Sequence, residues 1–403
     1  MGEQAQSDGE LMLGGLLAAN HLTTMEDMPG VVAEYAALAG FSKVRIYVTD
    51  LQRLILTPLP GQYDESGRPL EPLRIDATLA GRAYSTVEMV RAPDSVGDRV
   101  WVPLLDGTER VGVLGLTMSE PGEVAEWRVK QMASLVTMLL VEKRLNSDSF
   151  ARLVRARPMA LSAEVLMNLL PPGTFATEDV VVSAALEPAY EVGGDSYDYA
   201  IDGDVLHVSI FDAMGHDAAA GVTATIAMGA CRNHRIEQDD LPMTAEAIDA
   251  AIREQFTGRF STGILSDLNL RTGWLSWVNR GHHPPLVLRD GRLAAVLESE
   301  PDPPMGFGLT PSTGLVRYQL QPGDRLVFYT DGIIEAKSPD GELFGLERFI
   351  DFIIRHEADG LTAPETLRRL IQAVLRHQRD RLQDDATVLI VEWHGQRHEQ
   401  LLL

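Results

Sequence analysis

The stretch FDAMGHDAAAG, residues 211–221, ends an apolar run with an acidic residue and opens a run of small residues with Gly-His-Asp. The apolar run predicts a strand, and the sequence AAAGVTATIAMGAC after Asp217 predicts a helix. Asp212, His216 and Asp217 are therefore expected where a strand turns into a helix. Residues of these types can cap a helix or bind a metal ion, so the other acidic residues have to distinguish the two.

The composition narrows the class of protein. The chain has 403 residues, which suits two domains of roughly 150–200 residues each. Its 35 Lys and Arg against 58 Asp and Glu give a net charge of -23, which argues against a nucleic-acid partner. One cysteine, Cys231, excludes an intrachain disulfide framework. The sequence has no secretory signal and no apolar run of about 18 residues, so we expect a cytoplasmic protein without a membrane span.

The first part of the chain mixes helical and strand patterns. MPGVVAEYAALAG has helical spacing, KVRIYVTD and RLILTPL alternate, and Asp106-Gly107 marks a hairpin. We expect an N-terminal tail over residues 1–20 and a compact α/β domain over 21–145.

A helical linker is predicted over residues 146–175. One helix is expected over residues 123–155, and a second, MALSAEVLMNLL, would carry Leu161, Val165 and Leu169 in one apolar stripe. This apolar stripe is expected either to pack against its own domain or to form a dimer contact, and the sequence is compatible with both.

Residues 176–395 show strands joined by short turns, and we expect a C-terminal tail over 396–403. Helices are expected at about 217–232, 243–256, 346–357 and 363–381. This pattern predicts antiparallel sheets covered by helices, so the fold class of the whole chain is α+β.

Carboxylates recur at the strand ends of this second part. They are Asp195 and Asp198 in GGDSYDY, Asp212 in FDAMGHD, Asp331 in FYTDGIIE, and Asp384 with Asp385 in DDATVLIV. Buried carboxylates that converge repel one another unless cations are present. An all-oxygen site suits Mg²⁺ or Mn²⁺, and two such ions can activate a water for phosphoryl displacement. The sequence also lacks a P-loop, an HExxH motif and a Gly-x-Ser-x-Gly motif.

The hairpin before Asp212 gives a geometric expectation. With a three-residue turn at residues 202–204, Gly194 lies opposite Asp212, and Asp195 lies one register step away. A bulge, which Gly193-Gly194 makes possible at low cost, would then be needed to bring both aspartates onto one side.

Several residues keep two readings. Asp217 is a good N-cap but could also add an outer contact to a metal site, and His216 could polarise phosphate or pack in the turn. Asp198 and Asp385 could bind metal or backbone N–H groups. His282-His283 are disfavoured as joint ligands because adjacent residues on an extended segment point apart.

The order of six segments over about residues 175–395 resembles the PPM-type phosphatases of the SpoIIE-like bacterial branch. The segments are GGDSYDY, FDAMGH, NRGHHPPLVLR, MGFGL, YTDGIIEA and DDATVLIVEW. The first domain resembles a GAF sensor domain through FSKVRIYVTD, LAGRAY and VWVPLLDGTERVGVLGLTM. The resemblance implies an α-β-β-α sandwich with two Mn²⁺ or Mg²⁺ ions in a cleft at the edge of the sheets.

The resemblance also implies roles for individual residues. The metal ligands and catalytic residues would be the side chains of Asp195, Asp212, Asp331 and Asp384, the Ala213 carbonyl would be a further ligand, and Gly332 and Asp385 would shape the rim. The sequence departs from the family at Asp217, where glycine is usual, and at Ser196, where an aromatic residue is frequent. Neither departure removes an expected ligand.

The function implied is a metal-dependent protein serine/threonine phosphatase controlled by the sensor domain. Family substrates are phosphoproteins, typically STAS-fold anti-sigma-factor antagonists, and we expect a homodimer formed through the linker or the sensor domain. Two rival hypotheses remain: a catalytically silent sensor and binding module, and a metal hydrolase of a small phosphorylated metabolite.

Overall fold

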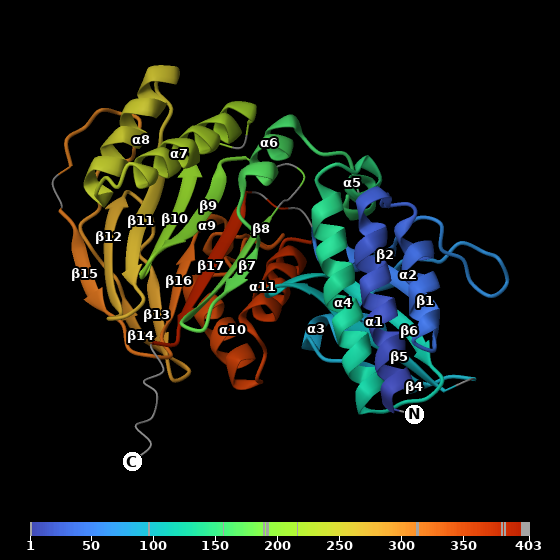
Figure 1. Cartoon of the computed structure of the whole chain (residues 1–403). Coiled ribbons are helices and arrows are strands. Elements are labelled where there is room, and N and C mark those ends of the chain that lie inside the picture. Colours follow the sequence, from blue (N-terminus) through green and yellow to red (C-terminus); the bar gives the residue numbers. More distant parts are fainter. Residues whose placement is uncertain are drawn as a thin grey trace, which may run out of the picture. The chain divides into compact units, whose positions relative to one another are not determined.

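The computed structural model describes residues 2–95, 97–155, 157–187, 190, 193–215, 217–311, 314–379, 382 and 384–395. His216 and the predicted tail 396–403 lie outside the described residues. The chain divides into two compact units, Met1–Pro158 and Met159–Leu403 (Figure 1). Among the described helices, none is long and apolar enough to cross a membrane.

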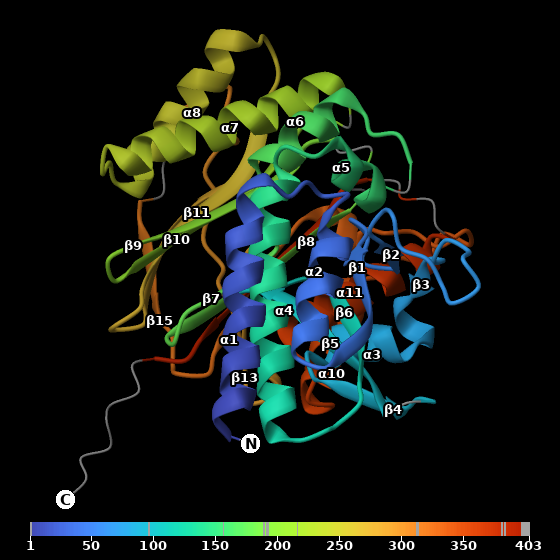
Figure 2. The same cartoon turned by 45° about the vertical axis from the view of Figure 1, so that its right-hand side comes forward.

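The first unit contains a six-stranded antiparallel sheet with the strand order β3-β2-β1-β6-β5-β4. Its elements are α1 (Gly2–Ala19), η1 (Asn20–Leu22), α2 (Met28–Leu38), β1 (Phe41–Thr49), β2 (Ile55–Pro58), β3 (Leu73–Arg74), η2 (Ile75–Ala77), α3 (Leu79–Thr86), β4 (Val90–Pro93), β5 (Asp98–Asp106), β6 (Glu109–Met118), α4 (Glu123–Arg144) and α5 (Asp148–Val154). Helices α1, α2 and α4 pack on one face of the sheet (Figure 2). Helix α3 covers a smaller core on the other face. The predicted hairpin at Asp106-Gly107 is confirmed by β5 and β6.

The structure differs from the expected tail at residues 1–20, because α1 belongs to the core of the first unit. Met12 and Leu16 of α1 are fully buried. A Cβ atom on Gly15 would lie 2.0 Å from the Tyr35 ring, so this glycine permits the close approach of α1 and α2. Glycines lower helix propensity, and this helix depends on packing that the local sequence does not reveal.

The single helix expected over residues 123–155 is wrong, since α4 ends at Arg144 and α5 begins at Asp148. Ser147 adopts an extended conformation, and its hydroxyl accepts a hydrogen bond from the Phe150 N–H at 3.1 Å. Serine at this position therefore caps a new helix instead of continuing the old one.

The second unit contains two antiparallel sheets, with strand orders β15-β12-β11-β10-β9 and β14-β13-β16-β17-β8-β7. Its helices are α6 (Leu161–Leu169), α7 (Ala218–Ile236), α8 (Leu241–Gln255), α9 (Asp331–Ile334), α10 (Leu346–Ala358) and α11 (Ala363–His377). Its strands are β7 (Thr174–Ala176), β8 (Val180–Glu187), β9 (Asp195–Asp202), β10 (Val205–Ala213), β11 (Ser261–Asn269), β12 (Trp274–Arg280), β13 (Leu286–Arg289), β14 (Arg292–Val296), β15 (Val316–Gln319), β16 (Arg325–Tyr329) and β17 (Ala386–Trp393).

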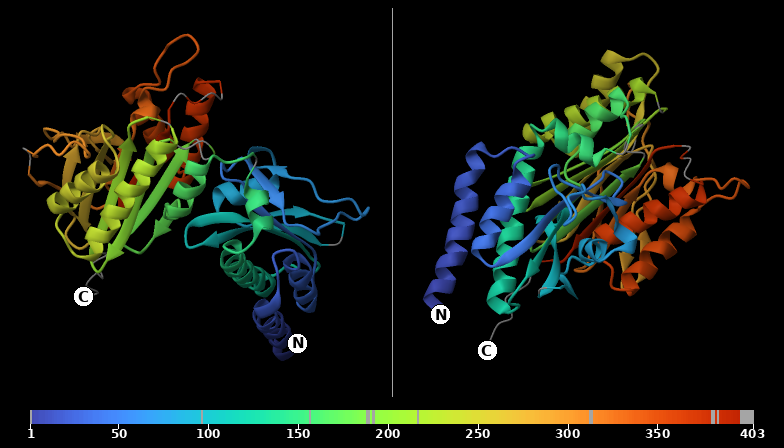
Figure 3. Two further views of the ribbon diagram at one scale, coloured as in Figure 1. Left: turned by 90° about the horizontal axis from the view of Figure 1, so that it is seen from above. Right: turned by 90° about the vertical axis from the view of Figure 1, so that its right-hand side faces the viewer.

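The two sheets pack face to face, and helices cover both outer faces (Figure 3). Alternate residues of β10, such as Leu206, Val208 and Ile210, enter the core between the sheets. Helices α6, α7 and α8 cover the outer face of the first sheet, and α9, α10 and α11 cover that of the second. This confirms the predicted α-β-β-α sandwich, and the period-2 alternation of the strands is its physical basis.

Helix α6 is present, but its buried face differs from the expected stripe. Ala163 and Leu166 are buried against the core that includes α7, whereas Leu161 and Val165 are 79% and 46% exposed. A Cβ atom on Gly221 of α7 would lie 2.6 Å from the Ser162 Cβ, so the two helices are in close contact there.

The expected hairpin register is also wrong. Asp202 lies opposite Val205, so the turn has only Gly203 and Asp204 between paired residues, and Gly203 has a φ of +56°. Glycine adopts this left-handed conformation without steric cost, which allows the tighter turn. The register consequently moves by one residue.

Candidate metal centre

Asp195 lies directly opposite Asp212 in the β9–β10 hairpin. The Ala213 N–H donates to the Gly194 carbonyl at 3.0 Å, so the neighbouring Asp195–Asp212 pair is one without mutual backbone bonds, in which side chains lie closest. Asp195 is 2% exposed and Asp212 is half-buried. The two carboxylates therefore share the sheet face that packs on the second sheet, with no need for a bulge.

The second sheet adds its own residues at the same edge. Strand β16 ends immediately before Thr330 and Asp331. The Thr330 hydroxyl donates to the Asp195 carboxylate at 2.6 Å and accepts from the Thr387 N–H at 2.9 Å. Asp195 is thus hydrogen-bonded to the end of one strand in the opposite sheet and, through Thr330, to the start of another.

Asp385 connects the sheets a second time. One of its carboxylate oxygens accepts from the N–H groups of Gly193, Gly194 and Asp195 at 2.7, 2.7 and 3.3 Å. Asp385 is 4% exposed, and its position just before β17 fixes the start of β9. Of the two roles considered for Asp385, metal binding and hydrogen bonding to backbone N–H groups, the structure contains the second.

Two glycines permit this close packing. A Cβ atom on Gly332 would lie 1.8 Å from the Asp385 carbonyl oxygen, and one on Gly194 would lie 2.0 Å from the Ala213 carbonyl oxygen. Contacts of that length are sterically impossible, so both positions require glycine if the rim keeps its geometry.

The site carries more negative charge than its protein surroundings compensate. Burial and then the charges of Asp331, Asp384 and Asp385 raise the pKa of Asp212 to about 7. Burial, followed by Asp212 and Asp385, raises the pKa of Asp195 well above the usual carboxyl range. Burial, followed by Asp384, raises the pKa of Asp331. The four acidic residues singled out from the sequence therefore act on one another in a single cluster, which bound cations would stabilise.

The donor chemistry fits divalent cations. Asp195, Asp212, Asp331 and Asp384 supply carboxylate oxygens, and Ala213 follows Asp212 at the same strand end. Hard oxygen donors of this kind suit Mg²⁺ or Mn²⁺. The residues present thus fit the two-ion site that the resemblance implies.

Asp198 is not part of this cluster. It is 1% exposed in its side chain and accepts hydrogen bonds from Arg232 at 2.6 Å and Arg235 at 2.8 Å, both on α7. Three positions beyond Asp195 on the same strand, it lies on the opposite face of the sheet. Its role is to hold α7 against the first sheet.

Asp217 caps helix α7. Its carboxylate accepts from the Ala220 N–H at 2.9 Å and from Arg259 at 2.6 Å. The hydrogen bond from Arg259 is the largest cause of its lowered pKa. These contacts match the capping interpretation of this residue.

The paired histidines lie in different environments. Nδ1 of His282 lies 2.9 Å from the Thr262 hydroxyl, and its Nε2 lies 3.1 Å from the Tyr329 carbonyl. Burial lowers the pKa of His282 to about 3, so it is a neutral packing residue. His283 stacks on the Tyr329 ring, with 5.7 Å between the ring centroids, and partly offsets the effect of burial that raises the pKa of Asp331.

Sequence reasoning missed Thr330 and His283 as neighbours of the cluster. The signal for Thr330 was its position immediately before Asp331 at a strand end. Cys231 lies on α7 and is buried in the core between this helix and the first sheet.

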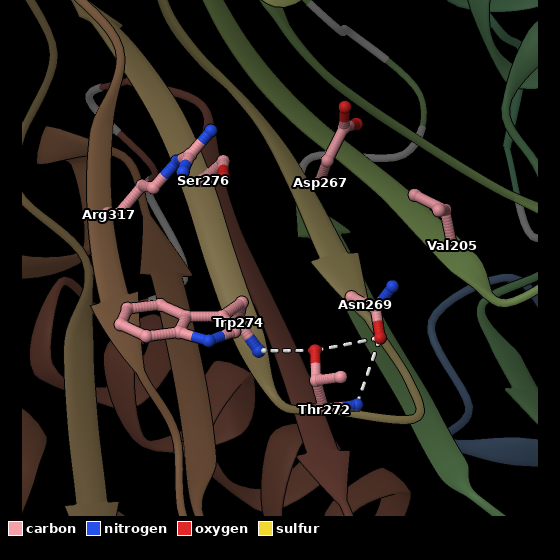
Figure 4. Close-up of a pocket in the computed structure, with 7 residues that line it drawn as sticks. All are labelled: Val205, Asp267, Asn269, Thr272, Trp274, Ser276 and Arg317. Atoms are coloured by element: carbon pink, nitrogen blue, oxygen red, sulfur yellow. Dashed lines mark hydrogen bonds between the residues drawn. The ribbon is translucent and has the colours of Figure 1, made fainter.

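A pocket of about 340 Å³ lies elsewhere on the first sheet (Figure 4). It is lined by Val205, Asp267, Asn269, Thr272, Trp274, Ser276 and Arg317. Val205 is at the opposite end of β10 from Asp212, roughly 23 Å away at about 3.3 Å per residue. The pocket and the carboxylate cluster are therefore separate sites.

Residues 202–394 match the protein family described as Stage II sporulation protein E (SpoIIE). The second unit thus contains a domain that resembles this family. The matched range includes Asp212, Asp331 and Asp384, and Asp195 lies just before it. The predicted SpoIIE-like resemblance is confirmed, and the GAF-like reading of the first unit stays a prediction.

Two curated relatives resemble this chain over part of its length. Protein IcfG of Synechocystis sp. is 25% identical over 264 residues, which cover 57% of this chain and 40% of IcfG. The phosphoserine phosphatase RsbU of Bacillus subtilis is 21% identical over 244 residues, which cover 57% of this chain and 68% of RsbU. The chain thus spans well under two thirds of IcfG.

Among solved structures, the serine/threonine phosphatase PstP of Mycobacterium tuberculosis is 18% identical, with a TM-score of 0.39. The match covers 54% of this chain and 100% of that one. The catalytic domain of PstP has also been solved in complex with two manganese ions.

Proposed function

We propose that the second unit is a metal-dependent protein serine/threonine phosphatase. The observation that carries the proposal is the convergence of Asp195, Asp212, Asp331 and Asp384 where the ends of two sheets meet. The similarity to a phosphoserine phosphatase supports the same chemistry.

The ligands of two Mn²⁺ or Mg²⁺ ions would be these four carboxylates and the Ala213 carbonyl. Such ions supply an activated water and neutralise the charge of the phosphoryl group during in-line displacement. Asp385 and Thr330 position Asp195 through the hydrogen bonds described above. Asp385, Thr330 and the two tight glycines thus keep the ligand set in place before substrate arrives.

The chemistry requires no nucleophile from the protein. Cys231 lies 3.8 Å from the Ser209 hydroxyl inside the helix-covered core, and burial raises the pKa of its thiol to about 11. A neutral buried thiol is a poor nucleophile, so a cysteine-phosphatase mechanism is disfavoured.

The partner we propose is a phosphorylated STAS-fold anti-sigma-factor antagonist. The sensor of the phosphatase would be the GAF-like domain predicted over residues 21–145, which lies within the first unit. The helical linker, residues 146–175, would transmit the sensor state to the phosphatase domain, residues 176–395, in a cytoplasmic homodimer. Support comes from the GAF-like segments of the first unit and from the similarity to RsbU.

The test compares substrates on the full chain. Phosphate release is measured from a phosphoserine peptide, a phosphorylated STAS-domain protein, a phosphotyrosine peptide and a nucleoside monophosphate, with and without Mn²⁺. We expect Mn²⁺-dependent release from the two phosphoserine substrates. Release from the nucleotide alone would instead show a metabolite hydrolase. No divalent-ion binding by calorimetry and no release would show a silent binding module.

A further inference from the structure

Four apolar side chains are exposed or half-buried on segments that adjoin the strand end carrying Asp212. Met214, Phe307 and Leu309 are 40%, 44% and 54% exposed, and Phe260 is half-buried. We call these four residues the apolar rim. They come from the position directly after β10, the segment before β11 and the loop before β15.

The apolar rim is directly connected to the strand end that carries Asp212. Met214 follows Asp212 by two positions, and its N–H donates to the Phe260 carbonyl at 3.0 Å. The Phe260 and Phe307 rings lie 5.0 Å apart between centroids. The rim therefore borders the cluster through covalent and hydrogen-bonded neighbours.

The loop that carries Phe307 is held in one conformation. The Asp249 carboxylate accepts from the Gly306 N–H at 2.7 Å and from the Gly308 N–H at 3.0 Å. Gly306 has a φ of +120°, and a Cβ atom there would lie 2.5 Å from the Arg259 carbonyl oxygen. Phe307 sits between two anchored glycines, so its exposure follows from a defined backbone and not from fraying.

Because the protein is strongly acidic, contacts with uncharged side chains are expected to contribute to substrate binding at this edge of the sheets. The chain has a net charge of -23, and the cluster is itself acidic, so long-range electrostatics disfavours an anionic phosphoprotein. Exposed apolar side chains grouped beside a reactive site typically mark a binding surface. An extended chain advances about 3.3 Å per residue, so the neighbours of a phosphorylated residue at the cluster reach adjacent surface.

We propose that the apolar rim binds an apolar side chain flanking the phosphorylated serine or threonine of the protein substrate. This inference rests on the proposed phosphatase function and adds a sequence preference to it. The occupant is a peptide segment with Leu, Ile, Met or Phe next to the phosphoresidue.

The experiment uses the full chain with Mn²⁺ and two seven-residue phosphoserine peptides. One has alanine at every flanking position, and the other has leucine on both sides of the phosphoserine. We expect the wild-type protein to show a kcat/KM at least about tenfold higher for the leucine peptide, which corresponds to about 1.4 kcal/mol. Phe307→Ala and Leu309→Ala each move this ratio toward one. Trp274→Ala, a matched control 49% exposed in the distant pocket, keeps the wild-type ratio.

The possible results distinguish a failure of the apolar-rim inference from a failure of the proposed phosphatase function. A wild-type ratio near one, with measurable phosphate release, overturns the inference and leaves the phosphatase function standing. A ratio that both variants retain also overturns it. No release from either peptide or from para-nitrophenyl phosphate rejects the function itself and the inference with it. The ratio of the two kcat/KM values is taken within one protein, so it does not depend on how much of that protein is active. Because more than half of the Leu309 side chain is exposed, Leu309→Ala is expected to fold and tests the inference even if Phe307→Ala does not fold.

Discussion

Asp195 and Asp212 face each other as direct partners of an antiparallel hairpin, on the sheet face that packs against the second sheet. Two carboxylates in this arrangement repel each other, and the charges of Asp331, Asp384 and Asp385 add to the repulsion. The fold therefore accepts an electrostatic cost at one edge, which is typical of sites built for cations.

The first prediction concerns this cost. Burial and neighbouring carboxylates raise the pKa of Asp195 in the folded protein. Its protonated carboxyl therefore favours the folded state at pH values below the ordinary carboxyl range, and this contribution to the free energy of unfolding is lost as the pH rises through the raised pKa. In chelator at about pH 7.5, Asp195→Asn is therefore expected to raise Tm by a few degrees. The same variant should lose the rise in Tm that Mn²⁺ produces in the wild-type protein. Thermal unfolding with and without Mn²⁺ measures both effects.

Asp198→Asn is the matched control on the same strand. Asp198 is paired with Arg232 and Arg235, so its loss should destabilise the protein by about 3 kcal/mol and leave the Mn²⁺-dependent rise in place. If both variants changed Tm in the same direction, the conclusion that neighbouring carboxylates destabilise Asp195 would be wrong.

A second prediction concerns Asp385. Asp385→Ala leaves the N–H groups of Gly193, Gly194 and Asp195 without their carboxylate partner, at a cost of roughly 2–4 kcal/mol in unfolding free energy. Because Asp195 then loses its positioning, we expect Mn²⁺ affinity to fall about 10- to 100-fold. Denaturant unfolding and calorimetry test the two parts, and unchanged Mn²⁺ affinity would contradict the positioning role.

A third prediction concerns Gly332. Gly332→Ala places a methyl group within 1.8 Å of the Asp385 carbonyl oxygen, so the rim must move and phosphatase activity should fall at least about tenfold. Gly229→Ala on α7 is the control, since its Cβ would meet nothing within 4 Å. That variant should keep full activity and gain up to about 1 kcal/mol of stability. Equal activity of the two variants would exclude close packing at Gly332 as a requirement.

A fourth prediction separates capping from metal binding at Asp217. Asp217→Ala removes the cap of α7 and the partner of Arg259, so Tm should fall modestly while the Mn²⁺ concentration for half-maximal activity stays the same. Asp217→Ser, which keeps a cap, should restore most of the Tm. A changed Mn²⁺ requirement in both variants would favour the outer-contact reading instead.

The sequence predicted antiparallel sheets covered by helices from the strand and turn pattern of residues 176–395, and the α-β-β-α layering was implied by the family resemblance. It also predicted which strand ends carry carboxylates. The hairpin register was not predictable, since DGD between Ile201 and Val205 is compatible with turns of two or three residues. A one-residue change there decides whether Asp195 faces Asp212.

Long-range contacts explain the remaining differences. Helix α1 contains glycines that disfavour an isolated helix, and it is stabilised by the packing of Met12 and Leu16 in the first unit. The bond between Thr330 and Asp195 joins residues that are 135 positions apart. Local sequence patterns do not reveal pairs so far apart in the chain. The position of Thr330 and Asp195 at strand ends indicated only the edge of the sheets at which they lie.

The proposed metal centre is tested most directly by the initial rate of phosphate release from a phosphoserine peptide as Mn²⁺ is titrated, in the wild-type protein and in Asp212→Ala. We expect the rate to rise with Mn²⁺ in the wild type and to be at least about 100-fold lower in the variant. A variant that matches the wild-type rate at every Mn²⁺ concentration would contradict the assignment of Asp212 and its neighbours as the metal centre.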